Sequence, residues 1–462
     1  MNNVIAPSMF VCLLVVLLLG YPVAFSLAAI ACVFGVIGLV TGAFDPPFLL
    51  AMLFRLQGIF GNDNLLAIPM LIFMGVLLER TAIAEDMFAA LGRLFSRLSG
   101  GIAYGTILVG ALLSSMTGFV SASVVAIGLI SLPVMVRAGY NHSLATGVAA
   151  ASGTLAQIIP PSLVLIILAE QMEVSLQAIF HGAVIPSLML ISLYVFYIFA
   201  RTWHNPSLAP AIASMSDPQR EKIPLWRDLL VSMGLPVGLV GLVLASISFG
   251  IATPSEGGAI GVTGTLLLAL MRGRLTPARL KAAMDATGIL CACIIFLLIG
   301  ASFFTLVFRG FDGHLWVENL LSLLPQDRVG FVVLINLLLL VLAFFLDFFE
   351  IAFIVLPLIA PVANRLGIDM VWLSVIIAVN LQTSFMHPPF GLALYNLRSV
   401  APRSISTASI YWGAVPFIGI QFLVVVLLIL FPKLVLKERE VKNPAVEINI
   451  QLPEAMPPLI SR

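Results

Sequence analysis

The chain is long, strongly apolar and almost neutral. Its 462 residues are 61% hydrophobic and 10% charged, and its formal net charge is +1. Soluble domains are about 45–50% apolar and about 25% charged, so a soluble core could not use this many apolar side chains. The near-neutral charge also gives no indication of nucleic-acid binding. The composition therefore excludes an ordinary soluble protein and indicates a membrane protein.

Apolar runs recur along the whole length, which indicates several membrane spans rather than one anchor. In chain order these runs are Phe10–Leu19, Leu188–Ala200, Leu235–Ile247, Ile289–Ile299, Phe331–Leu346 and Phe417–Phe431. Only helices and closed barrels satisfy their backbone hydrogen bonds in lipid, and runs this continuous are typical of helices. No Lys or Arg precedes the first run, so we interpret it as a retained span rather than a signal peptide. We predict an all-α polytopic membrane protein.

Motifs for the common catalytic chemistries are missing from the sequence. It contains no Gly-x-x-x-x-Gly-Lys-Ser/Thr phosphate loop, no His-Glu-x-x-His metal motif and no Gly-x-Ser-x-Gly elbow. The four cysteines, Cys12, Cys32, Cys291 and Cys293, lie in apolar sequence and suggest neither a disulfide framework nor a zinc site. We predict that the chain is not an enzyme and hydrolyses no ATP.

The first half contains two polar interruptions of apolar sequence. The tip Gly61–Asn64 divides two apolar stretches, and we predict a re-entrant hairpin over residues 49–79. The small and hydroxylated residues of Ser114–Ser123 divide another apolar stretch, which predicts a helix broken within the membrane. Non-helical backbone at that depth is tolerated only inside protein or against a water-filled cavity.

The second half repeats this order. Gly300–Ser302 predicts the turn of a second hairpin over residues 287–322, and Asp347–Glu350 predicts a second broken helix. In each half a Thr and then a proline pair follow: Thr154 with Pro160 and Pro161, and Thr383 with Pro388 and Pro389. Paired interruptions at corresponding positions are typical of inverted-repeat transporters.

This order predicts a membrane permease over residues 1–432. The first repeat is expected at residues 45–200 and the second at 229–432, joined by a polar surface linker at 202–228. The polar tail at 433–462 is expected to be disordered.

A broken helix presents free N–H groups at one half-helix and free C=O groups at the other, so one interruption can hold an anion and a cation together. The carbonyls of Gly118 and Phe119 and the hydroxyl of Ser121 are oxygen donors of the kind that a hard cation such as Na⁺ prefers. The alternative is that small residues here only allow close helix packing. The predicted Na⁺ ligands are Asn62, Asn64, Gly118, Phe119, Ser121, Thr154, Gly300, Ser302 and Asp347.

Three ionisable residues have both a functional and a structural interpretation. Asp347 lies where a charge costs about 2.5–3.5 kcal/mol, and it either binds the ion or caps a half-helix. His387 either binds a carboxylate or a proton, or bonds to a neighbouring carbonyl. Glu256 is either a functional acid or the partner of Thr253 in a capping box. The predicted substrate-binding residues are Ser123, Ser152, Gln382, Thr383 and His387.

Several stretches resemble the large membrane subunit of the tripartite ATP-independent periplasmic (TRAP) transporters. These are Leu65–Pro69, Leu144–Ser162 and Ala252–Glu256. Val379–Gly391 is similar to the branch often labelled mannitol/chloroaromatic, which includes 2-oxo acid systems. The match runs in order from Gly20 to Phe431.

The resemblance implies an elevator-type fold of the ion transporter superfamily in a bacterial inner membrane. It implies Na⁺-coupled uptake of a small organic acid, with no other cofactor. The implied partners are a separate small membrane subunit of the Q type and a periplasmic substrate-binding protein of the P type. The chain departs from the family in having Phe119 and Val120 where two serines are common, and His387 where Thr is common. The first ion site must therefore use carbonyls or Ser121.

Two other classes of function remain open. A stand-alone anion:Na⁺ or H⁺ symporter or exchanger of the wider superfamily would need no binding protein. A passive channel or a membrane scaffold would not accumulate its cargo. Saturable uptake that depends on a Na⁺ gradient separates these alternatives from the transporter.

Overall fold

The computed structural model describes residues 2–117, 119–211, 224–322, 327–344, 346, 348–388 and 391–436. Within these ranges the chain is helical and contains no strand. Seven of the described helices are long and apolar enough to cross a membrane, and the bent pair α3–α4 makes an eighth. The prediction of an all-α polytopic membrane protein is confirmed. Gly118, Asp347 and Pro389, and the tail from residue 437, lie outside the described residues.

The helices of the two halves follow one another in the same order. The first half consists of α1 (Asn2–Leu18), α2 (Val23–Val40), α3 (Pro46–Phe60), α4 (Asp63–Arg80), α5 (Ile83–Leu94), α6 (Gly101–Thr117), α7 (Val120–Arg137), α8 (His142–Thr154), α9 (Leu163–Gln171) and α10 (Leu176–His204). The second consists of α12 (Leu225–Leu229), α13 (Leu235–Ser248), α14 (Pro254–Met271), α15 (Pro277–Gly310), α16 (Gly313–Ser322), α17 (Arg328–Leu342), α18 (Phe348–Glu350), α19 (Leu356–Arg365), α20 (Met370–Ser384), α21 (Leu392–Val400) and α22 (Thr407–Leu430).

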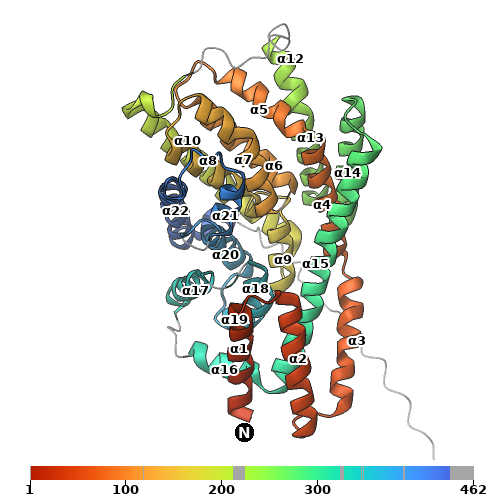
Figure 1. Cartoon of the computed structure of the whole chain (residues 1–462). Coiled ribbons are helices and arrows are strands. Elements are labelled where there is room, and N and C mark those ends of the chain that lie inside the picture. Colours follow the sequence, from red (N-terminus) through yellow and green to blue (C-terminus); the bar gives the residue numbers. More distant parts are fainter. Residues whose placement is uncertain are drawn as a thin grey trace, which may run out of the picture.

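Helices of the first half pack on helices of the second half in matching pairs. Helix α2 packs on α15 while α4 packs on α14, and α8 packs on α22 while α10 packs on α20. Such reciprocal contacts are what a pseudo-twofold axis between two repeats produces. The correspondence extends to α2, which lies N-terminal to the repeat boundary expected near residue 45. Figure 1 shows α2, α3, α4, α14 and α15 along one side of the molecule and α6–α10 with α20–α22 along the other.

The predicted hairpin over residues 49–79 is wrong. Helices α3 and α4 meet at a bend of 51°, far from the reversal that a hairpin needs. Both helices follow α15 in the opposite direction: Phe48 lies against Gly310, and Pro69 lines the same small cavity as Cys291. The polar tip Gly61–Asn64 is therefore a kink in one long span (Figure 1).

The second predicted hairpin turn is also wrong, because α15 is one helix of 34 residues that runs straight through Gly300–Ser302. A Cβ on Gly300 would lie 2.7 Å from the carbonyl oxygen of Ala24 in α2. The small residue allows two helix backbones to approach, which is the packing role that small residues have in membranes. The chain turns later, at Phe311 and Asp312.

The hairpins of this fold lie where broken helices were predicted. The backbone N–H of Ile102, at the start of α6, donates to the hydroxyl of Tyr140, just after α7, at 3.2 Å. Arg328, at the start of α17, donates to the carbonyl of Leu366, just after α19, also at 3.2 Å. Each pair of helices therefore folds back on itself. Both interruptions were correctly located, but the structure makes them hairpin turns.

The broken helices lie at the two proline pairs. Helix α8 ends at Thr154 and α9 begins at Leu163, with a cis bond between Pro160 and Pro161. Helix α20 ends at Ser384 and α21 begins at Leu392. Proline removes a backbone donor and disfavours helical geometry in the residue before it, so Pro160, Pro161 and Pro388 oppose continuation of the helix where they lie. Each half thus has one hairpin followed by one broken helix.

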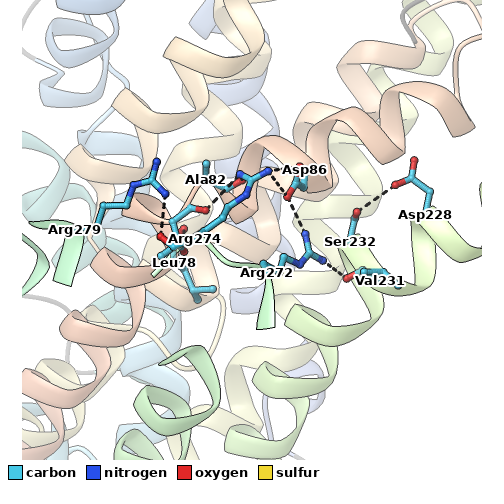
Figure 2. A network of polar contacts seen from close by, with 10 residues as sticks. Leu78, Ala82, Asp86, Asp228, Val231, Ser232, Arg272, Arg274 and Arg279 are labelled. Carbon is cyan, nitrogen blue, oxygen red and sulfur yellow. Dashed lines mark hydrogen bonds and ion pairs between the residues drawn. The ribbon is translucent and has the colours of Figure 1, made fainter. Parts of the chain in front are cut away.

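A network of ion pairs joins α5 to α12 and to the residues that follow α14 (Figure 2). Arg272 and Arg274, after α14, both bind the buried carboxylate of Asp86, at 2.8 and 3.1 Å. Arg93, at the end of α5, pairs with Asp228 of α12 at 2.6 Å. Buried carboxylates need such partners, because an unpaired buried charge is strongly destabilising.

We predict that Gly413→Ala destabilises the fold. Helices α8 and α22 cross so closely that a Cβ on Gly413 would lie 2.2 Å from the carbonyl oxygen of Ser143. Overpacking of this kind costs about 1–3 kcal/mol, and the melting temperature in detergent should fall accordingly. Gly419→Ala in the same helix is the matched control, because its Cβ would meet nothing within 4 Å. Equal melting temperatures for the two variants would contradict the prediction.

Candidate functional site

The two hairpins meet at their turns. Phe119 lies at the turn between α6 and α7, and Phe349 lies in α18 directly after the turn that follows α17. Their ring centroids are 6.4 Å apart. The two interruptions are therefore neighbours in space although they belong to different halves of the chain.

The two broken helices also meet. The side-chain amide of Gln382, near the end of α20, donates to the hydroxyl of Thr154 at the end of α8 at 3.3 Å. The same hydroxyl lies 3.4 Å from the sulfur of Met386, beyond the end of α20. Corresponding positions of the two halves thus contact each other directly.

Each hairpin is tied to the broken helix of its own half. Ser114 of α6 donates to the carbonyl of Ser152 in α8 at 3.1 Å. Asn380 of α20 donates to the carbonyl of Asn336 in α17 at 2.7 Å. The rings of Phe344 and His387 meet edge to face, with centroids 3.9 Å apart. Hairpins and broken helices together enclose one central region.

Unsatisfied polar atoms gather in this region. The side chain of Gln157 is fully buried, and neither its oxygen nor its nitrogen has a partner among the described residues. The same holds for Oε1 of Gln382, Nε2 of His387 and Oε1 of Gln421. An unsatisfied buried polar group costs about 1–3 kcal/mol, so native proteins keep such groups for water, an ion or a ligand. We name these four residues and Thr154 the central cluster.

The central cluster is neutral. The described residues contain no group of three or more His, Cys, Asp or Glu side chains that could hold a metal ion. Amide groups, hydroxyl groups and the free backbone groups of interrupted helices remain as ligands. Such partial charges suit a monovalent cation and a carboxylate, each of which is held without a full counter-charge.

Four predicted ion ligands lie elsewhere. Asn62 caps α4, accepting from the backbone N–H of Asn64 at 2.9 Å, and it donates to Glu170 at 2.7 Å. Glu170 lies at the end of α9 that is remote from its break. Gly300 and Ser302 lie within the uninterrupted α15, so no helix ends there to free a carbonyl. These four residues do not join the hairpin turns.

The other described candidates lie in the central region. Phe119 and Ser121 are half-buried at the first turn, and Thr154 belongs to the central cluster. The predicted substrate-binding residues, all buried, are Ser123, Ser152, Gln382, Thr383 and His387. The hydroxyls of Ser152 and Thr383 donate to carbonyls of their own helices, which leaves their oxygen lone pairs for a ligand. His387 combines both interpretations: Nδ1 bonds to the carbonyl of Ser384 at 2.6 Å, and Nε2 is the unsatisfied atom.

Two members of the central cluster were missed from the sequence. Gln157 lies between Thr154 and Pro160, in a stretch that had been singled out for its other residues. Gln421 lies in the apolar span α22 and donates to the hydroxyl of the buried Tyr194 at 2.8 Å. A lone amide in a membrane span is costly, and this signal was available in the sequence.

The capping interpretation of Glu256 is confirmed. Its carboxylate accepts from the backbone N–H of Thr253 at 2.8 Å, and its own N–H donates to the Thr253 hydroxyl at 3.3 Å. This reciprocal pair is a capping box at the start of α14. Both residues therefore have a structural role.

The chain is similar in sequence to known transporter proteins. The C4-dicarboxylate TRAP transporter large permease protein DctM of Pseudomonas aeruginosa is 27% identical over 76% of this chain and 81% of its own length. The ectoine/5-hydroxyectoine TRAP transporter large permease protein UehC of Ruegeria pomeroyi is 26% identical over 94% and 99%. The sialic acid TRAP transporter large permease protein SiaM of Vibrio cholerae is 26% identical over 90% and 94%.

Among solved structures, the YdaH transporter of Alcanivorax borkumensis has the same fold. It superposes with a TM-score of 0.60 over 91% of this chain and 98% of its own, at 17% identity. The family model of the tripartite ATP-independent periplasmic transporter, DctM component, matches residues 10–434. This chain therefore belongs to the DctM family, the large permeases of tripartite ATP-independent periplasmic transporters.

Proposed function

We propose that this chain takes up a small organic acid across the bacterial inner membrane, coupled to Na⁺. A small membrane subunit and a periplasmic binding protein, which delivers the cargo, complete the system. The observation that carries the proposal is the central cluster, where unsatisfied amide and imidazole atoms from both halves meet beside two interrupted helices. Such a site offers ligands to a carboxylate and to Na⁺ at once.

The membrane potential can drive uptake that is coupled to a monovalent cation such as Na⁺. One inward Na⁺ gains about 2.3 kcal/mol per 100 mV of membrane potential. Two or more Na⁺ with one monocarboxylate make transport electrogenic and concentrative. The relatives are named for different cargoes, so the class of organic acid rests on the site and on the similarity of Val379–Gly391 to the 2-oxo acid branch.

The packing supports an elevator movement. Hairpins, broken helices, α10 and α22 form one body, and α1–α5 with α12–α16 form the other. Hydrogen bonds between these bodies include Asn62 to Glu170 at 2.7 Å and Gln177 to the carbonyl of Ile247 at 3.1 Å. Much of the remaining contact between the two bodies is apolar. Packed helices can slide past one another along such a surface, which is the shear type of domain movement.

Reconstitution tests the whole proposal. The chain is placed in proteoliposomes with its small subunit, and the cognate binding protein carries a ligand identified by thermal-shift screening. We expect saturable accumulation that requires an inward Na⁺ gradient and the binding protein. Uptake by this chain alone would favour the stand-alone symporter. Equilibration without accumulation would indicate a channel.

We expect Thr154→Val and Thr383→Val each to weaken Na⁺ coupling; Thr383, predicted from the sequence to bind substrate, is included because it is the counterpart of Thr154 in the second half. Both hydroxyls donate to carbonyls three residues earlier, at 2.9 and 2.6 Å, which leaves oxygen lone pairs at the two breaks. Loss of one oxygen ligand should raise the Na⁺ concentration for half-maximal uptake about tenfold, the effect of about 1.4 kcal/mol. Thr265→Val in α14 is the control, since that hydroxyl is buried and bonded in the same manner. An unchanged Na⁺ requirement in both variants would remove the two threonines from the ion site.

A cross-link between the two bodies should stop transport. Asn62→Cys combined with Glu170→Cys places two thiols where the native side chains lie 2.7 Å apart. In a background without the native cysteines, Hg²⁺ should bridge the pair and block uptake, and an excess of dithiothreitol should restore it. Each single variant is the control. Full uptake with the bridge demonstrably formed would contradict the elevator.

A further inference from the structure

A polar cavity of about 650 Å³ lies between the two bodies, away from the central cluster. One wall comes from α3 and α15 and carries Arg55 and Arg309. The opposite wall comes from the end of α9 and from α19, and it carries Glu170 and Glu173. The predicted function gave no role to Arg55 or Arg309.

Among the described residues, the two arginines have no ionic partner. Arg55 is half-buried and donates to the carbonyl of Ser302 at 3.3 Å. Neither Arg55 nor Arg309 forms an ion pair with any residue of the described ranges. Both arginines line the same cavity. Glu170 of the opposite wall accepts a hydrogen bond from Asn62, the N-cap residue of α4, at 2.7 Å.

Unpaired guanidinium groups in a recess attract carboxylates. The guanidinium fork matches a carboxylate with two parallel hydrogen bonds, and Arg keeps its charge in any surroundings. A recess with low-dielectric walls focuses the field of its charges and raises the local concentration of the opposite ion. Two such groups on one wall suit an organic anion.

The basic residues indicate which side of the membrane this cavity faces. Helix α15, at 1.5 Å per residue, is about 51 Å long and exceeds the hydrocarbon core of about 30 Å, so its ends lie on opposite sides. Figure 2 shows Arg272, Arg274 and Arg279 gathered at its start, on the ion-pair network of Asp86. The basic residues at that end include Arg80, Arg93, Arg97, Arg272, Arg274, Arg279 and Lys281. By the positive-inside rule that end is cytoplasmic, and the cavity beside Arg309 faces the periplasm.

We propose that Arg55 and Arg309 form a periplasm-facing receiving site that holds the carboxylate before it reaches the central cluster. The proposal rests on the proposed function, since it names where the delivered acid first binds this chain. Both arginines lie on the body formed by α1–α5 and α12–α16, so the site stays in place while the other body moves.

Charged thiol reagents test this site without knowledge of the cargo. Thr305→Cys, in the cavity wall, is introduced into the complex in whole cells, with Cys12, Cys32, Cys291 and Cys293 replaced by Ala. Membrane-impermeant methanethiosulfonates, one carrying a carboxylate and one a trimethylammonium group, are added outside. We expect both reagents to label the Thr305→Cys thiol. When each rate is divided by the rate of the same reagent with a free thiol in solution, the anionic reagent should be the faster. Ala278→Cys, exposed at the start of α15, should stay unlabelled.

Neutralising the arginines should weaken the preference for the anionic reagent. In Arg55→Gln combined with Arg309→Gln, the ratio of anionic to cationic rates should fall about tenfold. Arg55→Lys should keep most of the ratio, because it keeps the charge. Arg365→Gln is the matched control at the same end of the molecule, since its charge is already paired with Glu318 at 3.0 Å.

Three outcomes would overturn the site: an unchanged ratio in the double variant, an equal fall in Arg365→Gln, or labelling of Ala278→Cys in place of Thr305→Cys. If the ratio behaves as expected and reconstituted uptake fails, the receiving site stands and the proposed function does not. If uptake succeeds and the ratio is unchanged, only the receiving site is lost.

Discussion

The need to satisfy every backbone N–H and C=O group in lipid governs this structure. A helix can end within the membrane only where other protein surrounds its bare peptide groups. Here the two hairpin turns and the two broken helices meet, as the contacts of Phe119 with Phe349 and of Thr154 with Gln382 show. Four interruptions that would each be costly alone therefore share one protected region. We propose that region as the binding site because it is the place where backbone charge is left over.

Local chemistry made some of the fold predictable. Proline removes a donor wherever it lies, and both proline pairs were recognised as a recurring motif, but the broken helices were predicted at Ser114–Ser123 and Asp347–Glu350 instead of at these pairs. The kink at Gly61–Asn64 and the turn within Ser114–Ser123 look alike in sequence, since both are polar gaps between apolar runs. What separates them is where the next helix finds its partner, and α4 continues along α15 whereas α7 returns along α6. That choice depends on contacts between distant segments.

The site was predictable to a similar extent. Thr154, Gln382 and His387 were predicted as ligands because they are polar and lie next to the proline pairs. The structure brings all three into one region. Gly300 was misinterpreted because small residues mark both helix breaks and close helix crossings. The lone amide of Gln421 in an apolar span could be recognised from the sequence, but the missing hydrogen-bond partners of Gln157 and Gln421 are visible only in three dimensions, since they depend on the whole surroundings.

The crossing of α8 and α22 sets the order in which the chain can mature. Gly147 and Gly413 approach so closely that neither position has room for a side chain. Helix α8 belongs to the first half, but α22, which covers it, begins only at Thr407. Domains generally fold from the N-terminal end as the ribosome delivers them. Helix α8 therefore lacks this packing partner until α22 has been synthesised and inserted.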